Sequence, residues 1–227
     1  MTQLANKYRP ATWSDLIGQD AIRDKVNNLR ARGIGGRAFW LSGPSGTGKT
    51  TIALLLAGEV AADINVAEID AADVTLDWIR DFAQSRFQRG LPIDGDQRIG
   101  RAVIVNESHT LRGPCVSRLL TLLENLPEHI VFVFTCQHEG TAALIDAHDD
   151  GPALMSRCQV YNVAQRALTD TFAAALVRGA RAEGLLNGKG DDYYVTRAKR
   201  LLKDLRNNMR AAWQQVDNGF LTDRDEE

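Results

Sequence analysis

The chain has 227 residues, 44% hydrophobic and 25% charged, with a formal net charge of -2; this leaves room for one large globular domain and a small one. The near-neutral charge excludes nucleic-acid binding through bulk positive charge, although it allows a local basic patch. No apolar run approaches the roughly 18 residues of a membrane span, and no signal-peptide core opens the chain, so we expect a cytoplasmic protein that binds no membrane.

Short apolar segments alternate with helical patterns through most of the chain. After a start at 5–10 that we expect to be extended, helices are predicted at 19–33, 50–61, 76–82 and 116–124. Strands are predicted at 38–42, 66–70, 102–105, 130–134 and 159–163. This alternation predicts an α/β fold whose parallel sheet is covered by helices on both faces.

From Leu168 onward the pattern is helical only, with helices expected at 168–183, 190–203 and 204–217. The change falls near Gln165. We therefore expect an α/β domain over residues 1–164, a small all-helical domain over 165–220 and a frayed acidic tail over 221–227.

A glycine-rich stretch, G-P-S-G-T-G-K-T at 43–50, fits the pattern G-x-x-x-x-G-K-[ST] without mismatch between a predicted strand and a predicted helix. In that setting, backbone N–H groups and the helix N-terminus surround a polyphosphate. Lys49 would reach the terminal phosphates, and the Thr50 hydroxyl would hold Mg²⁺. The expected nucleotide contacts are Gly43, Pro44, Ser45, Gly46, Thr47, Gly48, Lys49, Thr50 and Thr51. An ordinary glycine-rich turn is the alternative, which the complete pattern disfavours.

The strand predicted at 102–105 continues into Asn106 and Glu107. In a P-loop fold such a strand usually ends in an aspartate that orders the Mg²⁺ water shell, and in one large branch a glutamate that polarises the attacking water follows. Asn106 stands at the aspartate position, where an amide oxygen can accept from a Mg²⁺-bound water but brings no charge. We predict Glu107 as catalytic, and Asn106 with Thr50 as the magnesium site. A strand end that carries Asn-Glu without a role is the alternative.

Five stretches resemble, in order, motifs of the ATPase subunits of sliding-clamp loaders, which are members of the AAA+ ATPases. They are K-Y-R-P with W-S-D-L-I-G-Q (7–10 and 13–19), N-E-S-H-T-L (106–111), S-R-L-L-T-L-L-E-N-L-P-E-H (117–129), S-R-C (156–158) and N-M-R-A-A-W (208–213). The resemblance covers nearly the whole chain. It implies ATP and Mg²⁺ as ligands, an AAA+ nucleotide-binding core and a helical lid domain.

The resemblance also implies roles for residues outside the phosphate loop. Tyr8, Arg9 and Ile17 would line the pocket of the base, because a P-loop holds only phosphates; a simple packed N-terminal arm is compatible with this role. After the strand at 130–134, Gln137 would sense the terminal phosphate, with Thr135 as the alternative.

Two arginines carry further implications of the resemblance. Arg157 would enter the active site of an adjacent subunit and neutralise charge on the transferred phosphoryl group, which implies an oligomer with shared sites. A solvated surface arginine is the alternative. Arg210 would contact the nucleotide from the lid, and Arg206, one turn earlier, fits a similar pattern.

A cluster of arginines around the second helix of the α/β domain leaves DNA binding open. The cluster comprises Arg80, Arg86, Arg89, Arg98 and Arg101, with the acids Asp81, Asp94 and Asp96 interspersed. A track for the phosphates of primer–template DNA and a solvated mixed-charge surface are equally compatible with this composition.

Cysteines and histidines do not predict a metal site other than that for Mg²⁺. Cys115, Cys136 and Cys158 lack paired spacing, even with His109 and His138 considered, so we expect reduced thiols. We expect His109 to pack against the segment that follows Glu107.

We therefore expect an ATP-binding and hydrolysing clamp-loader subunit in DNA replication, with a sliding clamp, other loader subunits and primer–template DNA as partners. A hydrolysis-poor scaffold that donates Arg157 is one alternative, which Asn106 favours, and a branch-migration or recombination AAA+ ATPase is another. Loader subunits normally continue into a helical collar, whereas about ten residues follow the last predicted helix here. We expect assembly through the ATPase and lid domains or a separate chain, as in a minimal phage-type loader.

Overall fold

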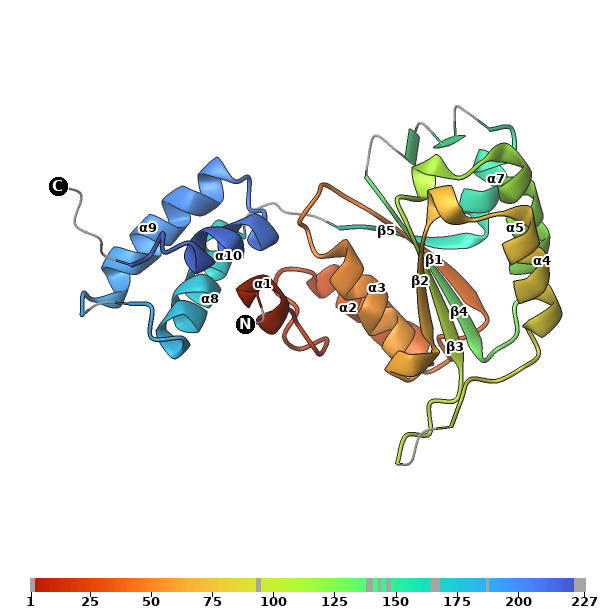
Figure 1. Cartoon of the computed structure of the whole chain (residues 1–227), viewed down its shortest axis with the longest axis horizontal. Helices are drawn as coiled ribbons and strands as arrows, with labels where there is room; N and C mark the ends of the chain where they lie inside the picture. The colour runs from red at the N-terminus through yellow and green to blue at the C-terminus, as the bar shows by residue number, and fades with distance from the viewer. Residues whose placement is uncertain are drawn as a thin grey trace. The chain divides into compact units, whose positions relative to one another are not determined.

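The computed structural model describes residues 3–92, 95–137, 141–142, 144–145, 148–163, 168–186 and 188–222 (Figure 1). The chain forms two compact units. The sheet unit comprises Ala21–Pro44 and Lys49–Val163, and the helical unit comprises Met1–Asp20, Ser45–Gly48 and Ala164–Glu227. The expected boundary at Gln165 and residues 223–227 of the expected tail lie outside the described residues. Within the described residues, none of the helices is both long and apolar enough to cross a lipid bilayer.

Five parallel strands form the sheet, in the order β2-β3-β4-β1-β5. They are β1 (Arg37–Ser42), β2 (Val66–Asp70), β3 (Arg101–Asn106), β4 (Ile130–Cys136) and β5 (Cys158–Asn162). Every residue of the central strand β4 is buried, as its unbroken apolar run requires between two helical layers. The five predicted strands are confirmed within one or two residues.

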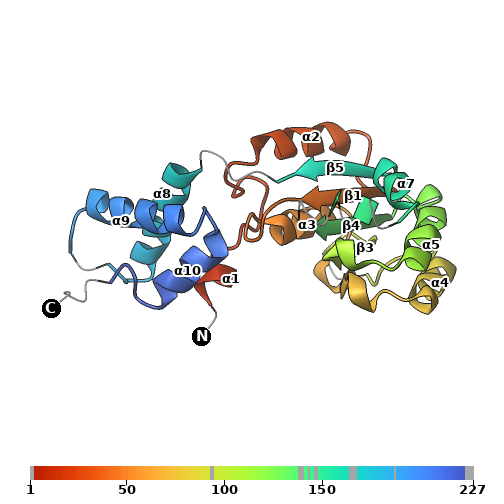
Figure 2. The ribbon, with the colours of Figure 1, turned by 90° about the horizontal axis from the view of Figure 1, so that it is seen from above.

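Helices cover both faces of the sheet (Figures 1 and 2). The helices α2 (Asp20–Arg30) and α3 (Lys49–Gly58) lie on one face, and α4 (Leu76–Ser85), α5 (Gly113–Glu124) and α7 (Gly151–Ser156) lie on the other. Trp40, Phe132 and Phe134 point from the strands into a core that Phe82 of α4 and Leu119 of α5 complete. The predicted α/β class is therefore confirmed.

The helical unit contains α8 (Thr169–Ala182), α9 (Asp191–Asp204) and α10 (Met209–Asp217), together with a short N-terminal helix, α1 (Leu4–Lys7). Apolar residues of α8 recur at helical spacing and pack with those of the other helices in one core. The backbone N–H of Leu4 donates to the Asp217 carboxylate at 3.0 Å, which attaches α1 to α10. The prediction of an extended start at 5–10 is thus wrong for residues 5–7, because this packing stabilises a helical turn.

The last helix begins five residues later than predicted. Arg206 and Asn207 have φ of 50° and 59°, so the backbone leaves the α9 helix in a left-handed turn. The backbone N–H of Asn207 donates to the carbonyl of Leu202 at 2.7 Å, which closes the end of α9. The Asn208 side chain then accepts from the N–H of Ala211 at 3.1 Å and caps α10.

Candidate functional site

The glycine-rich loop joins β1 to α3. Gly46 and Gly48 have φ of 74° and 93°, a conformation that glycine adopts without steric cost. The Lys49 ammonium donates to the carbonyl oxygens of Gly43 and Pro44, at 2.8 Å in each case. Because α3 begins at Lys49, the N–H groups of its first turn have no acceptor within the helix, and helix N-termini of this kind commonly bind anions.

The strand order brings the predicted site residues of the sheet unit to one edge. β4 lies between β1 and β3, with Ser42 paired to Cys136 and Val105 paired to Phe134. The carboxyl ends of the three strands are therefore adjacent, and the segments that follow them lie along the same edge. This edge carries Gly43, Lys49, Thr50, Asn106, Glu107, Thr135 and Gln137.

Asn106 ends β3 and contacts residues of both neighbouring strands. Its Oδ1 accepts a hydrogen bond from the buried Thr135 hydroxyl of β4 at 3.0 Å. Its Nδ2 lies 3.5 Å from Oε2 of Glu68 in β2. Glu68 was not predicted as a site residue. The sequence signal for Glu68 is the strand V-A-E-I-D at 66–70, which carries two acids at alternate positions. The register pairs Asp70 with Asn106, and Glu68, two residues earlier, points to the same face of the strand.

Glu107 has a left-handed backbone, with φ of 49° and ψ of 46°, which is rare for a residue other than glycine. Such a conformation costs about 1–3 kcal/mol and is common at functional sites. The Glu107 carbonyl accepts from the N–H and the hydroxyl of Thr110, at 2.9 and 3.0 Å, and these bonds stabilise the turn. The Glu107 carboxylate is half-exposed, so water can reach it.

His109 lies beside Glu107 itself. Its Nδ1 is 3.5 Å from the Glu107 carboxylate and 3.8 Å from Sγ of Cys136. Burial raises the pKa of the Cys136 thiol, so this group stays protonated and neutral next to the ring. Cys115, Cys136 and Cys158 are all buried and unpaired thiols.

The two candidate sensor residues differ in their surroundings. Thr135 is 4% exposed and bonded to Asn106. Gln137 is exposed just beyond β4, and its backbone carbonyl accepts from the N–H of Thr141 at 3.1 Å. Of the two, Thr135 is the one that is held against a predicted magnesium residue.

Arg157 lies in the turn between α7 and β5, on the surface of the sheet unit. Its Nε donates to Oε1 of Glu124 at 3.2 Å, its Nη2 donates to the same oxygen, and its Nη1 donates to the Ala153 carbonyl at 3.0 Å. The guanidinium is therefore held by α5 and α7 of its own chain.

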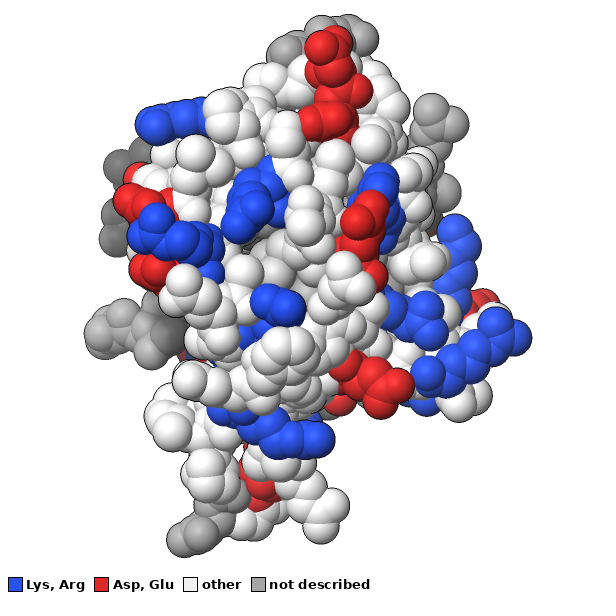
Figure 3. All heavy atoms as spheres, turned by 90° about the vertical axis from the view of Figure 1, so that its right-hand side faces the viewer, with Lys and Arg blue, Asp and Glu red and all other residues white. Residues whose placement is uncertain are grey.

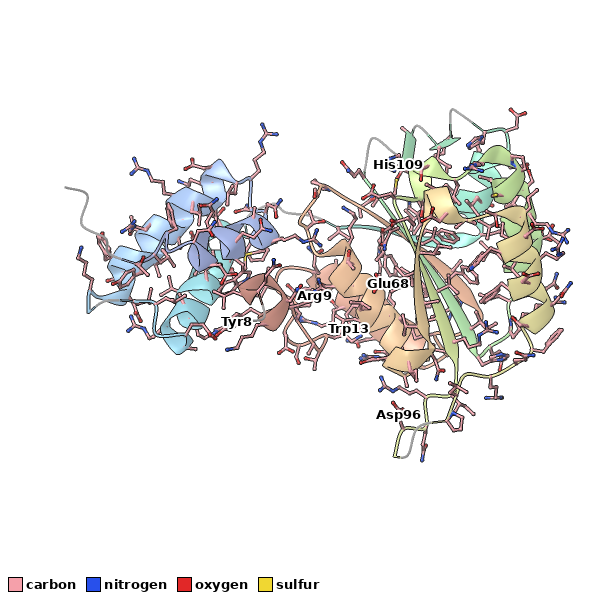
Figure 4. All side chains as sticks on the ribbon, in the orientation of Figure 1. Tyr8, Arg9, Trp13, Glu68, Asp96 and His109 are labelled. Carbon is pink, nitrogen blue, oxygen red and sulfur yellow. The ribbon has the colours of Figure 1, made fainter. Side chains whose placement is uncertain are left out.

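The predicted base-pocket residues all belong to the helical unit. The Tyr8 ring stacks on Trp213 with centroids 4.5 Å apart, and its hydroxyl donates to Glu183 at 2.6 Å (Figure 4). This hydrogen bond raises the pKa of Tyr8 to about 12. Ile17 packs on the same core, and Arg9 donates to Asn6 at 3.2 Å. The lid candidates Arg206 and Arg210 are both exposed.

Most arginines of the predicted DNA cluster have local partners. Arg98 is paired with Asp96 at 2.6 Å, and Arg80 with Asp77 at 3.0 Å. The Arg86 and Arg101 guanidinium groups lie over phenylalanine rings. Figure 3 shows basic and acidic side chains interspersed on the face formed by α4, α5 and α7. These contacts favour the mixed-charge surface, and Asp94 lies outside the described residues.

The side chains at the strand edge fit a magnesium nucleotide. Mg²⁺ prefers oxygen ligands and keeps several waters, so it needs few protein groups besides the phosphates. The Thr50 hydroxyl, the Asn106 amide oxygen and the carboxylates of Glu68 and Glu107 provide such oxygens. Among the described residues, which do not include His138, no group of three or more histidines, cysteines or acids forms a separate metal cluster.

Comparison with known proteins agrees with this architecture. The sequence model described as "ATPase family associated with various cellular activities (AAA)" matches residues 39–181. The replication factor C small subunit of Haloarcula marismortui is 28% identical over 185 residues, which cover 78% of this chain and 51% of that protein. The DNA polymerase III subunit gamma/tau of Mycoplasma pneumoniae is 29% identical over 180 residues, which cover 70% of this chain and 24% of that protein. The chain thus spans between about a quarter and half the length of these relatives.

A solved structure of RuvB from Thermotoga maritima has the same fold. It superposes with a TM-score of 0.67 at 18% identity, over 93% of this chain and 65% of that chain. The family match, the complete phosphate loop and the order of the strands lead to one conclusion: the chain belongs to the AAA family of ATPases.

Proposed function

We propose that the chain binds and hydrolyses Mg²⁺-ATP as a subunit of a sliding-clamp loader in DNA replication. The observation that carries the proposal is the single sheet edge to which the strand order brings Gly43, Lys49 and Thr50 of the phosphate loop, Asn106 and Glu107. The similarity to a DNA polymerase III subunit gamma/tau and a replication factor C small subunit supports the assignment to a loader. Residues 1–164 would form the nucleotide-binding core, of which Met1–Asp20 belongs to the helical unit, and 165–220 would form the lid.

The residues at the carboxyl ends of the strands have separate roles in the proposed reaction. The loop N–H groups and the Lys49 ammonium bind the β- and γ-phosphates. Thr50 and Asn106 would hold Mg²⁺, which neutralises phosphate charge when bound. The Glu107 carboxylate orients a water for attack on the γ-phosphorus and accepts its proton. Gln137 would sense the terminal phosphate, with Thr135 as the alternative; because the Thr135 hydroxyl already donates its one proton to Asn106, Thr135 would act through that residue.

Arg157 completes the site of a neighbouring subunit in this proposal. It exchanges the Glu124 carboxylate of its own chain for the γ-phosphoryl group of the neighbour. Tyr8, Arg9 and Ile17 contact the base, and Arg210 or Arg206 contacts the nucleotide from the lid. The partners are other loader subunits, a sliding clamp and primer–template DNA.

The proposal is tested by ATP turnover with and without a sliding clamp and primer–template DNA. We expect the two together to stimulate turnover, and we expect the Glu107→Gln variant to bind ATP without this stimulation. Turnover that is the same in both proteins and indifferent to clamp and DNA, while ATP still binds, would contradict it. A hydrolysis-poor scaffold would give that result, with Arg157 still required by a partner subunit.

A branch-migration ATPase is the second candidate function. It is favoured by the fold similarity to Thermotoga maritima RuvB, of which one solved structure is titled as a Holliday junction branch migration motor. The two functions differ in their substrate. Movement of a four-way DNA junction without any clamp would support the second candidate, whereas stimulation by a clamp and a primed end supports the first.

A further inference from the structure

The edge strand β2 carries an acidic residue next to the amide at the predicted magnesium position. Glu68 is exposed in β2, and its Oε2 lies 3.5 Å from Nδ2 of Asn106. The strands are parallel and in register, with Asp70 beside Asn106 and Glu68 beside Ile104. Because side chains two residues apart point to the same face of a strand, Glu68 and Asn106 share one face.

The contacts of Asn106 fix the orientation of its amide. A carboxylate only accepts hydrogen bonds, so the amide turns its NH₂ group toward Glu68. Its Oδ1 then faces the Thr135 hydroxyl, which donates to it at 3.0 Å. The result is a directed chain from Thr135 through Asn106 to Glu68, across three neighbouring strands. An amide oxygen has two lone pairs, so one remains for a water of the magnesium shell.

We propose that Glu68 is a positioning residue of the ATP site. From β2 it supplies the negative charge that Asn106, in the neighbouring strand β3, lacks. The proposal rests on the proposed Mg²⁺-ATP site at this edge. An aspartate at position 106 would place two acceptor groups side by side, whereas the amide donates toward Glu68. Glu68 thereby lies next to the site and also orients the oxygen of Asn106.

The experiment measures how strongly Mg²⁺ enhances nucleotide binding. The affinity of an ATP analogue with a nitrogen bridge between the β- and γ-phosphates is measured in excess Mg²⁺ and again in EDTA, and the ratio is compared between variants. We expect Glu68→Gln to lower the ratio by about tenfold or more, as is typical for loss of an outer partner of a metal site. Its affinity in EDTA should stay at or above the wild-type value, because the phosphate loop is intact.

A matched control and a rescue make the result specific. Glu128→Gln makes the same substitution in the turn before β4. This turn lies at the amino ends of the strands, away from the site, so the variant should keep the wild-type ratio. Combining Asn106→Asp with Glu68→Gln returns one carboxylate to the pair, and we expect it to restore the ratio. Asn106→Asp alone creates two adjacent carboxylates and should not raise the ratio above wild type.

Three outcomes would overturn the proposal. In the first, Glu68→Gln keeps the wild-type ratio of affinities; in the second, Asp70→Asn lowers this ratio and Glu68→Gln does not. In the third, the double variant fails to regain the wild-type ratio. The double variant also separates a charge effect from misfolding, since misfolded protein would not regain binding. If the wild-type protein itself shows no enhancement by Mg²⁺, the proposed ATP site fails. If it shows enhancement that Glu68→Gln leaves unchanged, only the role of Glu68 fails.

Discussion

The guanidinium of Arg157 donates from Nε and Nη2 to a single carboxylate oxygen of Glu124. Both side chains are partly exposed, at 32% and 48%, and such surface pairs contribute only about 0–1 kcal/mol. A weak partner of this kind keeps the arginine ordered in an isolated subunit, yet a phosphoryl group can displace it. The pair therefore suits a residue that acts on a neighbouring chain.

Mixing two inactive variants tests whether Arg157 acts on a neighbour. We expect Arg157→Ala and Glu107→Gln each to lower turnover. For Arg157→Ala the expected loss is about 10³-fold or more. A mixture of the two should recover part of the activity, because some sites then combine Glu107 of one chain with Arg157 of another. Glu124→Gln, which only releases the arginine, should keep full turnover. An inactive mixture would show that Arg157 does not act between chains.

Lys49 is expected to dominate phosphate binding. Replacing it by methionine removes the ammonium that donates to the loop carbonyls and, when nucleotide is present, to the phosphates. Hydrogen bonds to charged groups contribute about 1.5–3 kcal/mol, so we expect ATP affinity to fall roughly ten- to a hundredfold. Fluorescent ATP titration measures this. Lys203→Met, in the last turn of α9, is the control and should leave affinity unchanged.

The Tyr8–Glu183 bond makes the stability of the helical unit depend on pH. The pKa of Tyr8 is raised from its ordinary value of 10.0 to about 12, mainly by the hydrogen bond to Glu183, so the protonated phenol is favoured in the folded state. This stabilisation is complete below pH 10 and is lost as the pH rises toward 12. Glu183 has a lowered pKa, caused first by Lys7 and then by Tyr8, so its contribution is lost when the medium becomes acidic.

Thermal melts across this range test the pair. The difference in melting temperature between wild type and Tyr8→Phe should shrink as the pH rises from 10 to 12. In a Glu183→Gln background, the same Tyr8→Phe change should lose that pH dependence. A difference that stays constant between pH 10 and 12 in the wild-type background would show that the bond does not form in solution.

The local sequence determines the sheet more directly than it determines the N-terminal arm. Residues 130–134 of β4 are apolar because helices cover both faces of this strand, so this run alone marks a buried strand. Residues 4–7 form a helix only because Leu4 packs on distant helices and bonds to Asp217, and no local pattern carries that information. The late start of α10 depends on the left-handed residues Arg206 and Asn207, which helical periodicity does not detect.

The same distinction holds for the site. The phosphate loop and Asn106-Glu107 are contiguous motifs, so the residue order by itself predicts their chemistry. Glu68 lies 38 residues from Asn106 in the chain and meets it only through the register of β2 and β3. Arg157 and Glu124 are likewise 33 residues apart. Partners set by strand register and helix packing require the three-dimensional structure.

The aromatic core of the sheet unit should dominate its stability. Phe132 is fully buried in β4 and contacts the rings of Phe82 and Phe134. We expect Phe132→Ala to lower the free energy of unfolding by about 3–5 kcal/mol, because it leaves a cavity. Phe87→Ala also removes a phenyl ring, but at a position that is 72% exposed, and should change the free energy of unfolding by only about 0.5 kcal/mol. Urea unfolding measures both, and equal effects would contradict the described core.

In the proposed mechanism, Glu107, which follows β3 directly, activates the attacking water. Single-turnover hydrolysis of bound ATP, compared between wild type and Glu107→Gln, tests it most directly because it separates chemistry from binding and product release. We predict that Glu107→Gln binds ATP with wild-type affinity and hydrolyses it about 10²- to 10⁴-fold more slowly. Equal single-turnover rates in the two proteins would contradict the assignment of Glu107 and the account of the site built on it.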